Sequence, residues 1–185
     1  MQGCITLQRI HVFGARLHVH WSALVAAGLL FGAFASQPIH AAIAVACYFS
    51  VILLHEAGHA LFAKQLGYRP LNVYLTFIHG LCETEAPDWE KESSTIAWGG
   101  VLAQLAVALP LIVVSQLIPA GAVPLFPIVV AILGYMSVLV ALMNLAPAKG
   151  LDGQEAWKLF PILFSELRAR GSAKKAAKEV IRRVK

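Results

Sequence analysis

Long apolar segments separated by polar connections dominate the pattern of this 185-residue chain. A helix needs roughly 20 mostly apolar residues to cross about 30 Å of hydrocarbon. Residues 96–118 and 125–146 reach this length without a charged side chain, and residues 41–66 reach it with a few polar ones inside. A fourth apolar segment, 21–35, is shorter. The pattern therefore predicts an all-α polytopic membrane protein with about four transmembrane helices.

The connection between the second and third spans has a different pattern. Apolar and polar residues alternate over 72–77, which is typical of a strand. We therefore expect a short membrane-associated β segment between these helices, with a free edge that could pair with another extended peptide. Five acidic residues follow within 83–92 and indicate a solvated loop.

The basic residues indicate how the chain is oriented. The connections 36–40 and 119–124 contain no Lys or Arg, so all 15 basic residues fall on the opposite side of the membrane. The positive-inside rule makes that side cytoplasmic, and both termini are expected there. The sequence A-F-A that ends the first span at residue 35 is also typical of a signal-peptide cleavage site, so retention of this span stays open.

Composition supports the membrane interpretation. Hydrophobic residues make up 58% of the chain and charged residues 14%, whereas a soluble domain carries about 25% charged residues. The region from residue 168 to the C-terminus holds eight Lys or Arg and one Glu, a composition that favours anionic lipid over nucleic acid beside a membrane domain. We expect a membrane core over 1–155, followed at 156–185 by an interfacial helix and a basic cytoplasmic tail that contacts membrane lipid.

The second span contains the candidate chemistry, in the sequence H-E-x-x-H. His55 and His59 are four residues apart, so a helix places both imidazoles on one face, where they can bind one metal ion. Glu56 lies beside them, where a carboxylate can take a proton from a metal-activated water. Ionisable groups in a span cost at least about 2.5 kcal/mol each at the bilayer centre, so this cluster favours a functional site over a hydrogen-bonded polar cluster.

A catalytic zinc site usually has three protein ligands, so a third must come from elsewhere in the chain. Spans 2 and 4 run in the same direction, which places Asp152 on the same side of the membrane as the two histidines. A straight fourth span would overshoot the metal, and Pro147 and Gly150 are expected to break the helix and turn the chain back. Asp152 also begins a capping-box pattern, and Glu155 is a competing third ligand, so both alternatives stay open here.

Two motifs on the corresponding spans together resemble the site-2 protease family of intramembrane zinc metalloproteases. One is H-E-x-x-H at 55–59, and the other is N-L-A-P-A-K-G-L-D-G at 144–153, which is similar to the family's N-x-x-P followed by L-D-G. Order and spacing agree over about 40–155. The resemblance implies a Zn²⁺ ion bound by His55, His59 and Asp152, Glu56 as the general base, and Asn144 in contact with the substrate backbone.

The chain departs from the family pattern at two places. The segment 99–104 stands where the family often has Gly-Pro and a following Asn, which leaves the role of Gln104 undefined. His79 and Gly80 stand where the strand often ends in a Gly pair. His79 is a weaker candidate for contact with the metal, because a loop histidine is more often exposed. No PDZ or CBS domain fits within 185 residues.

The resemblance implies regulated intramembrane proteolysis, in which peptide bonds in or near transmembrane segments are hydrolysed. Expected substrates are membrane proteins such as anti-sigma factors or signal-peptide remnants, in a prokaryotic inner membrane. The alternative is a non-proteolytic membrane zinc-binding protein, either an adaptor or a transporter. A transporter should show polar residues along several spans, which the third and fourth spans largely lack, and an adaptor should not need Glu56.

Overall fold

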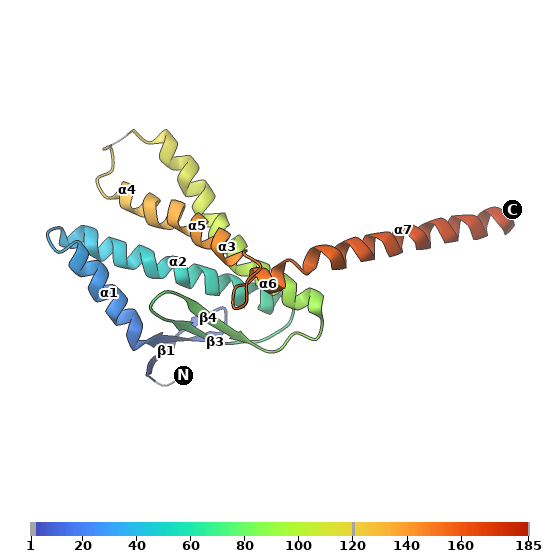
Figure 1. The fold of residues 1–185 in the computed structure, drawn as a ribbon, viewed down its shortest axis with the longest axis horizontal. Coiled ribbons are helices and arrows are strands. Elements are labelled where there is room, and N and C mark those ends of the chain that lie inside the picture. The colour runs from blue at the N-terminus through green and yellow to red at the C-terminus, as the bar shows by residue number, and fades with distance from the viewer. Residues whose placement is uncertain (1–2, 120, 185) are drawn as a thin grey trace.

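The computed structural model describes residues 3–119 and 121–184, and Figure 1 shows the course of the chain. Helices predominate, and a small sheet lies beside them. The elements in chain order are β1 (Cys4–Val12), β2 (Ala15–His20), α1 (Trp21–Ala33), α2 (Pro38–Gln65), β3 (Pro70–Leu75), β4 (Gly80–Thr84), α3 (Glu90–Leu117), α4 (Phe126–Val129), the π-helix η1 (Val130–Met136), α5 (Ser137–Asn144), α6 (Gly153–Ala156) and α7 (Leu159–Val184).

Three apolar helices are long enough to cross a membrane, as the sequence pattern predicts. They are α2, α3 and the continuous helix Phe126–Asn144 that α4, η1 and α5 form together. The chain is therefore an integral membrane protein. The first of the four expected spans forms α1, whose 13 residues rise only about 20 Å, so it is shorter than the hydrocarbon layer is thick.

A four-stranded sheet in the order β1-β2-β3-β4 explains why α1 is short, because the residues before it are extended. β1 and β2 form an antiparallel hairpin whose turn, Phe13-Gly14, has positive φ at both residues. β2 then pairs with β3 in parallel, and β3 pairs with β4 antiparallel. The sequence pattern indicated only the β3 region. The N-terminal hairpin was not expected.

Two expectations about the segment after α2 were wrong. We expected the strand over 72–78 to pair with an unwound substrate, but β3 has no free edge, because β2 occupies one side of residues 72–75 and β4 the other. The acidic segment is not a simple solvated loop either. Glu83 belongs to β4, and Glu90 and Glu92 form the first turn of α3, where carboxylates stabilise the helix N-terminus.

One face of the sheet packs against α2 beside the H-E-x-x-H sequence. The buried cluster between them consists of Ala15, Leu17, Ile52, Val73 and Leu75. These alternate positions of the strands point to one side of the sheet, as the period of two requires. Because Ile52 precedes the first histidine of the motif by less than one helical turn, this packing holds the sheet close to the candidate site.

The α2–α3 contact is a close approach of two helix backbones. A Cβ added to Gly58 would lie 2.2 Å from the carbonyl oxygen of Gly99, and one added to Gly99 would lie 2.6 Å from the carbonyl oxygen of Gly58. Only glycine fits at both positions, as at small-residue helix crossings in membranes. The crossing brings residues 96–104 of α3 directly beside the motif on α2.

After α5 the chain turns back, as Pro147 and Gly150 predict. Gly150 adopts φ +89°, and a Cβ on Gly153 would lie 2.3 Å from the carbonyl oxygen of Leu145. The segment between α5 and α6 is thus folded tightly onto the end of the last span. This turn returns Asp152 to the depth of the motif on α2.

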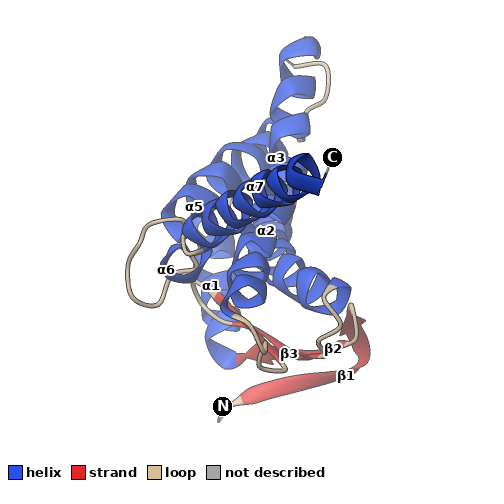
Figure 2. Ribbon diagram, turned by 90° about the vertical axis from the view of Figure 1, so that its right-hand side faces the viewer, coloured by secondary structure: helices blue, strands red, loops and turns tan. Residues whose placement is uncertain are grey.

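The C-terminal region forms one long helix, α7, which extends away from the rest of the chain (Figures 1 and 2). Pro161 lies in its first turn, where a missing N–H costs no helical hydrogen bond, so the helix continues through it. An ion pair between Lys91 Nζ and Glu166 Oε2 at 2.8 Å joins α7 to α3. Placement of α7 at a membrane interface stays a prediction.

Candidate metal centre

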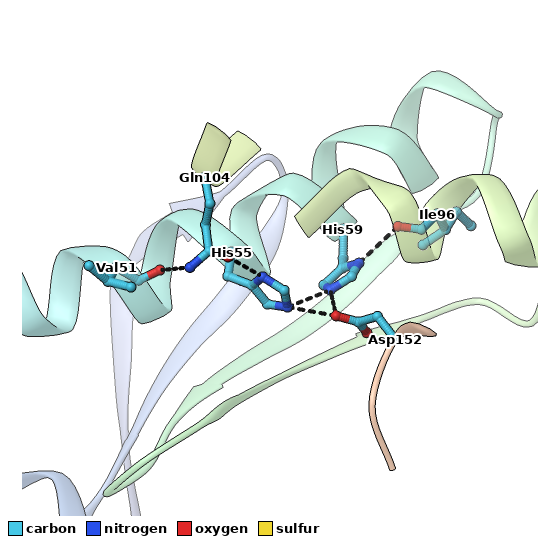
Figure 3. A network of polar contacts seen from close by, with 6 residues as sticks. All are labelled: Val51, His55, His59, Ile96, Gln104 and Asp152. Atoms are coloured by element: carbon cyan, nitrogen blue, oxygen red, sulfur yellow. Dashed lines mark hydrogen bonds and ion pairs between the residues drawn. The ribbon is translucent and has the colours of Figure 1, made fainter. Parts of the chain in front are cut away.

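Two histidines from α2 and one aspartate from the turn before α6 converge on one point (Figure 3). His55 Nε2 lies 2.8 Å from Asp152 Oδ2, and His59 Nε2 lies 3.4 Å from the same oxygen. The two Nε2 atoms are 3.1 Å apart. Residues 97 positions apart in sequence thus meet here.

The spacing of these three atoms fits a single zinc ion. Ligand atoms held about 2.0–2.1 Å from a tetrahedral metal lie about 3.3 Å from one another. The three observed separations, 2.8, 3.1 and 3.4 Å, are close to that value. Two imidazoles and one carboxylate are also a donor set typical of catalytic zinc, which leaves a position for water.

The far side of each imidazole is bound to α3. His59 Nδ1 lies 2.8 Å from the carbonyl oxygen of Ile96, and His55 Nδ1 lies 3.0 Å from Gln104 Oε1. Because a carbonyl only accepts, His59 carries its proton on Nδ1, and its Nε2 lone pair points at the centre. Carboxylates or carbonyls commonly hold metal-binding histidines in this way.

Asp152 directs its carboxylate at the histidines and not at the helix that it precedes. Its side chain makes no capping hydrogen bond to α6, so the capping-box interaction is absent. Burial alone would raise the pKa of Asp152, but the contacts with His55 and His59 outweigh it and lower the pKa below its usual range. Glu155, the competing ligand, is instead paired with Lys158 at 2.9 Å.

Glu56 is buried between α2 and β4, with 5% of its surface exposed. A Cβ added to Gly80 would lie 2.4 Å from Glu56 Oε1, so only glycine leaves room for this carboxylate. The backbone N–H of Cys82 faces the same carboxylate. The partly buried Cys82 thiol lies near the charges of Glu56 and Glu83. Burial first, and these charges second, raise the pKa of this thiol to about 12, so it stays protonated.

Gly100 lines the side of the centre that α3 covers. A Cβ added there would lie 2.6 Å from His59 Nε2 and 2.7 Å from His55 Cε1. The absence of a side chain at this position therefore lets both imidazoles approach the same point. It also brings the α3 backbone close to the space in which a metal ion would lie.

The other two candidate residues, His79 and Asn144, do not belong to this cluster. His79 is exposed in the turn between β3 and β4, and within residues 3–119 and 121–184 the only metal-binding group consists of the two α2 histidines and Asp152. Asn144 is the half-buried last residue of α5, and its role stays a prediction. Sequence reasoning missed the positions of Gln104, Gly80 and Gly100. The only sequence signal that pointed to these three residues was the departure from the family pattern at 79–80 and 99–104.

The chain is similar in structure to the site-2 protease from Methanocaldococcus jannaschii. The two share 22% sequence identity with a TM-score of 0.66, over 85% of this chain and 71% of that chain. No protein-family model matches the chain, and no curated protein matches it. At this identity the likeness shows a shared fold.

Proposed function

We propose that this chain, which has the fold of a site-2 protease, is an intramembrane zinc endopeptidase of that family. The observation that carries the proposal is the cluster of His55, His59 and Asp152 on apolar helices, with Glu56 beside it. Three ligand atoms and a separate carboxylate are the parts that metal-assisted hydrolysis of a peptide bond requires. An adaptor would need no carboxylate held apart from the ligands.

In this mechanism the two histidines and Asp152 hold the zinc ion. When bound, zinc would polarise the scissile carbonyl and lower the pKa of a water in the site toward about 7. Glu56 accepts the proton of the attacking water and then donates it to the nitrogen of the leaving amine. Burial against Gly80 and the N–H of Cys82 keep the carboxylate in one orientation during both transfers.

The proposed substrates are transmembrane segments, because the site lies on helices that would be surrounded by lipid. Anti-sigma factors and signal-peptide remnants belong to this class, and Asn144 would contact the substrate backbone at the end of α5.

We place the protein in a prokaryotic inner membrane with its termini in the cytoplasm and the basic residues of α7 near anionic lipid. Digestion by external protease of a C-terminal tag in intact cells would contradict this orientation.

Metal content tests the proposal without a substrate. Purified wild-type protein in detergent is expected to hold about one zinc per chain, and Asp152→Ala is expected to lose it because one of three ligands is gone. Glu56→Gln is expected to keep the zinc, since Glu56 is not a ligand. The measurement is elemental analysis of the three proteins after dialysis.

The thermal unfolding of each variant serves as the control for folding. Retention of zinc by Asp152→Ala would move the third ligand to another residue, and Glu155→Gln would then be the variant to compare. A folded wild-type protein that holds no zinc would contradict the proposed function.

A further inference from the structure

Gln104 is a fully buried amide in the middle of an apolar transmembrane helix, with 0% of its surface exposed. Burial of an amide without partners costs several kcal/mol in an apolar environment, so its hydrogen bonds must compensate. Both ends of this side chain contact α2. Oε1 lies 3.0 Å from His55 Nδ1, and Nε2 donates to the carbonyl oxygen of Val51 at 3.4 Å.

The contact with Val51 determines which way the amide points. A backbone carbonyl only accepts hydrogen bonds, so the NH₂ group must face it. The opposite orientation would place the amide oxygen against the carbonyl oxygen and leave two acceptors facing each other inside the protein. Gln104 therefore presents its oxygen to the imidazole of His55, as the close-up shows (Figure 3).

The orientation of the amide in turn determines the protonation of His55. An oxygen at 3.0 Å requires a proton on Nδ1, which leaves the lone pair of Nε2 directed at Asp152 and His59. An amide NH₂ at the same place would favour the other tautomer, whose Nε2 proton would block a metal. The tautomer of His59 needs no orienting side chain, since its partner is the backbone carbonyl of Ile96, which only accepts hydrogen bonds.

We infer that Gln104 is a positioning residue of the metal centre: anchored by the Val51 carbonyl, it holds His55 in the tautomer that binds metal through Nε2. The inference rests on the proposed function, because it concerns the zinc site itself. Groups that orient metal-binding histidines typically contribute 10- to 100-fold to metal affinity, and a similar contribution is expected here.

The test compares zinc affinity in variants with and without a side-chain oxygen that can accept the hydrogen bond from His55 Nδ1. Gln104→Met keeps the length of the side chain but removes the oxygen, and it is expected to weaken zinc binding by about 10- to 100-fold. Gln104→Glu retains an oxygen for His55 Nδ1 but loses the N–H that faces the Val51 carbonyl, so its zinc affinity is expected to lie between those of wild type and Gln104→Met. Zinc dissociation constants come from competition with a chromophoric chelator in detergent.

Gln116→Met is the matched control. It makes the same substitution on α3, about 18 Å along the helix, where the side chain contacts Ser115 and Tyr135 at the protein surface. Its zinc affinity is expected to equal that of wild type. The apo proteins are compared by thermal unfolding, so a variant that fails to fold is recognised before its affinity is interpreted.

Two results would overturn the inference. One is wild-type zinc affinity in Gln104→Met, and the other is an equal loss in Gln104→Met and Gln104→Glu, which would indicate a packing role only. Zinc binding by wild type without peptide cleavage would contradict the proposed function but leave the positioning role supported if Gln104→Met loses more affinity than Gln104→Glu. A wild-type protein that binds no zinc would overturn both.

Discussion

Replacement of Glu56 by glutamine is expected to slow peptide cleavage by about 10²- to 10⁴-fold while zinc stays bound. Glutamine keeps the shape of the side chain and fits the same space against Gly80, but it cannot accept a proton. The attacking water then loses its base, and the leaving amine loses its proton donor. The measurement is the initial rate of cleavage of a synthetic transmembrane peptide by protein reconstituted in liposomes.

Glu155→Gln is the matched control for this variant. Glu155 is a half-exposed carboxylate paired with Lys158 outside the cluster, so its loss should leave the cleavage rate nearly unchanged. A wild-type rate in zinc-loaded Glu56→Gln would show that Glu56 is not the base. Failure of the zinc-loaded wild type to cleave the peptide would instead favour the adaptor or transporter alternative.

A single methyl group at Gly100 is expected to weaken zinc binding strongly. In Gly100→Ala the new Cβ would lie 2.6 Å from His59 Nε2 and 2.7 Å from His55 Cε1, well inside van der Waals contact. Either the imidazoles turn out of line or α3 shifts away from α2, and each change disturbs the three-ligand geometry. We expect zinc affinity to fall by about 100-fold, the upper end of the range for loss of ligand orientation, as measured by chelator competition.

Gly28→Ala is the control for the effect of alanine on a membrane helix. Gly28 lies in α1 with open space around its Cα, so a methyl group there meets no atom within 4 Å. This variant is expected to bind zinc as wild type does and to be slightly more stable. Full zinc affinity in a folded Gly100→Ala protein would mean that α3 does not cover the metal centre in the way described.

Local geometry explains what could be predicted from the sequence. The four-residue spacing of His55 and His59 places both on one helix face whatever the fold around them. The return of the chain at Pro147 and Gly150 follows from the limits of these two residue types, and it brings Asp152 back to the level of the two histidines. Length and apolar composition alone identify the three long spans.

Contacts between distant segments explain what was missed. Residues 15–20 do alternate between apolar and polar, a local strand signal that was overlooked, but the pairing of β2 with β3, more than 50 residues later, has no local signal. The same pairing occupies one edge of β3 while β4 occupies the other, which a sequence pattern does not reveal. The role of Gln104 depends on a backbone crossing at Gly58 and Gly99, and that crossing decides which α3 residues face His55.

Zinc-dependent cleavage is the most direct test of the central claim. Purified protein in liposomes is incubated with a labelled transmembrane peptide, first as isolated, then after removal of metal by a chelator, and finally after addition of one equivalent of zinc. Cleavage that stops on chelation and returns with zinc, but not in Asp152→Ala, is the predicted result. Cleavage that persists in the metal-free protein would contradict the proposal that these three residues hold a catalytic metal.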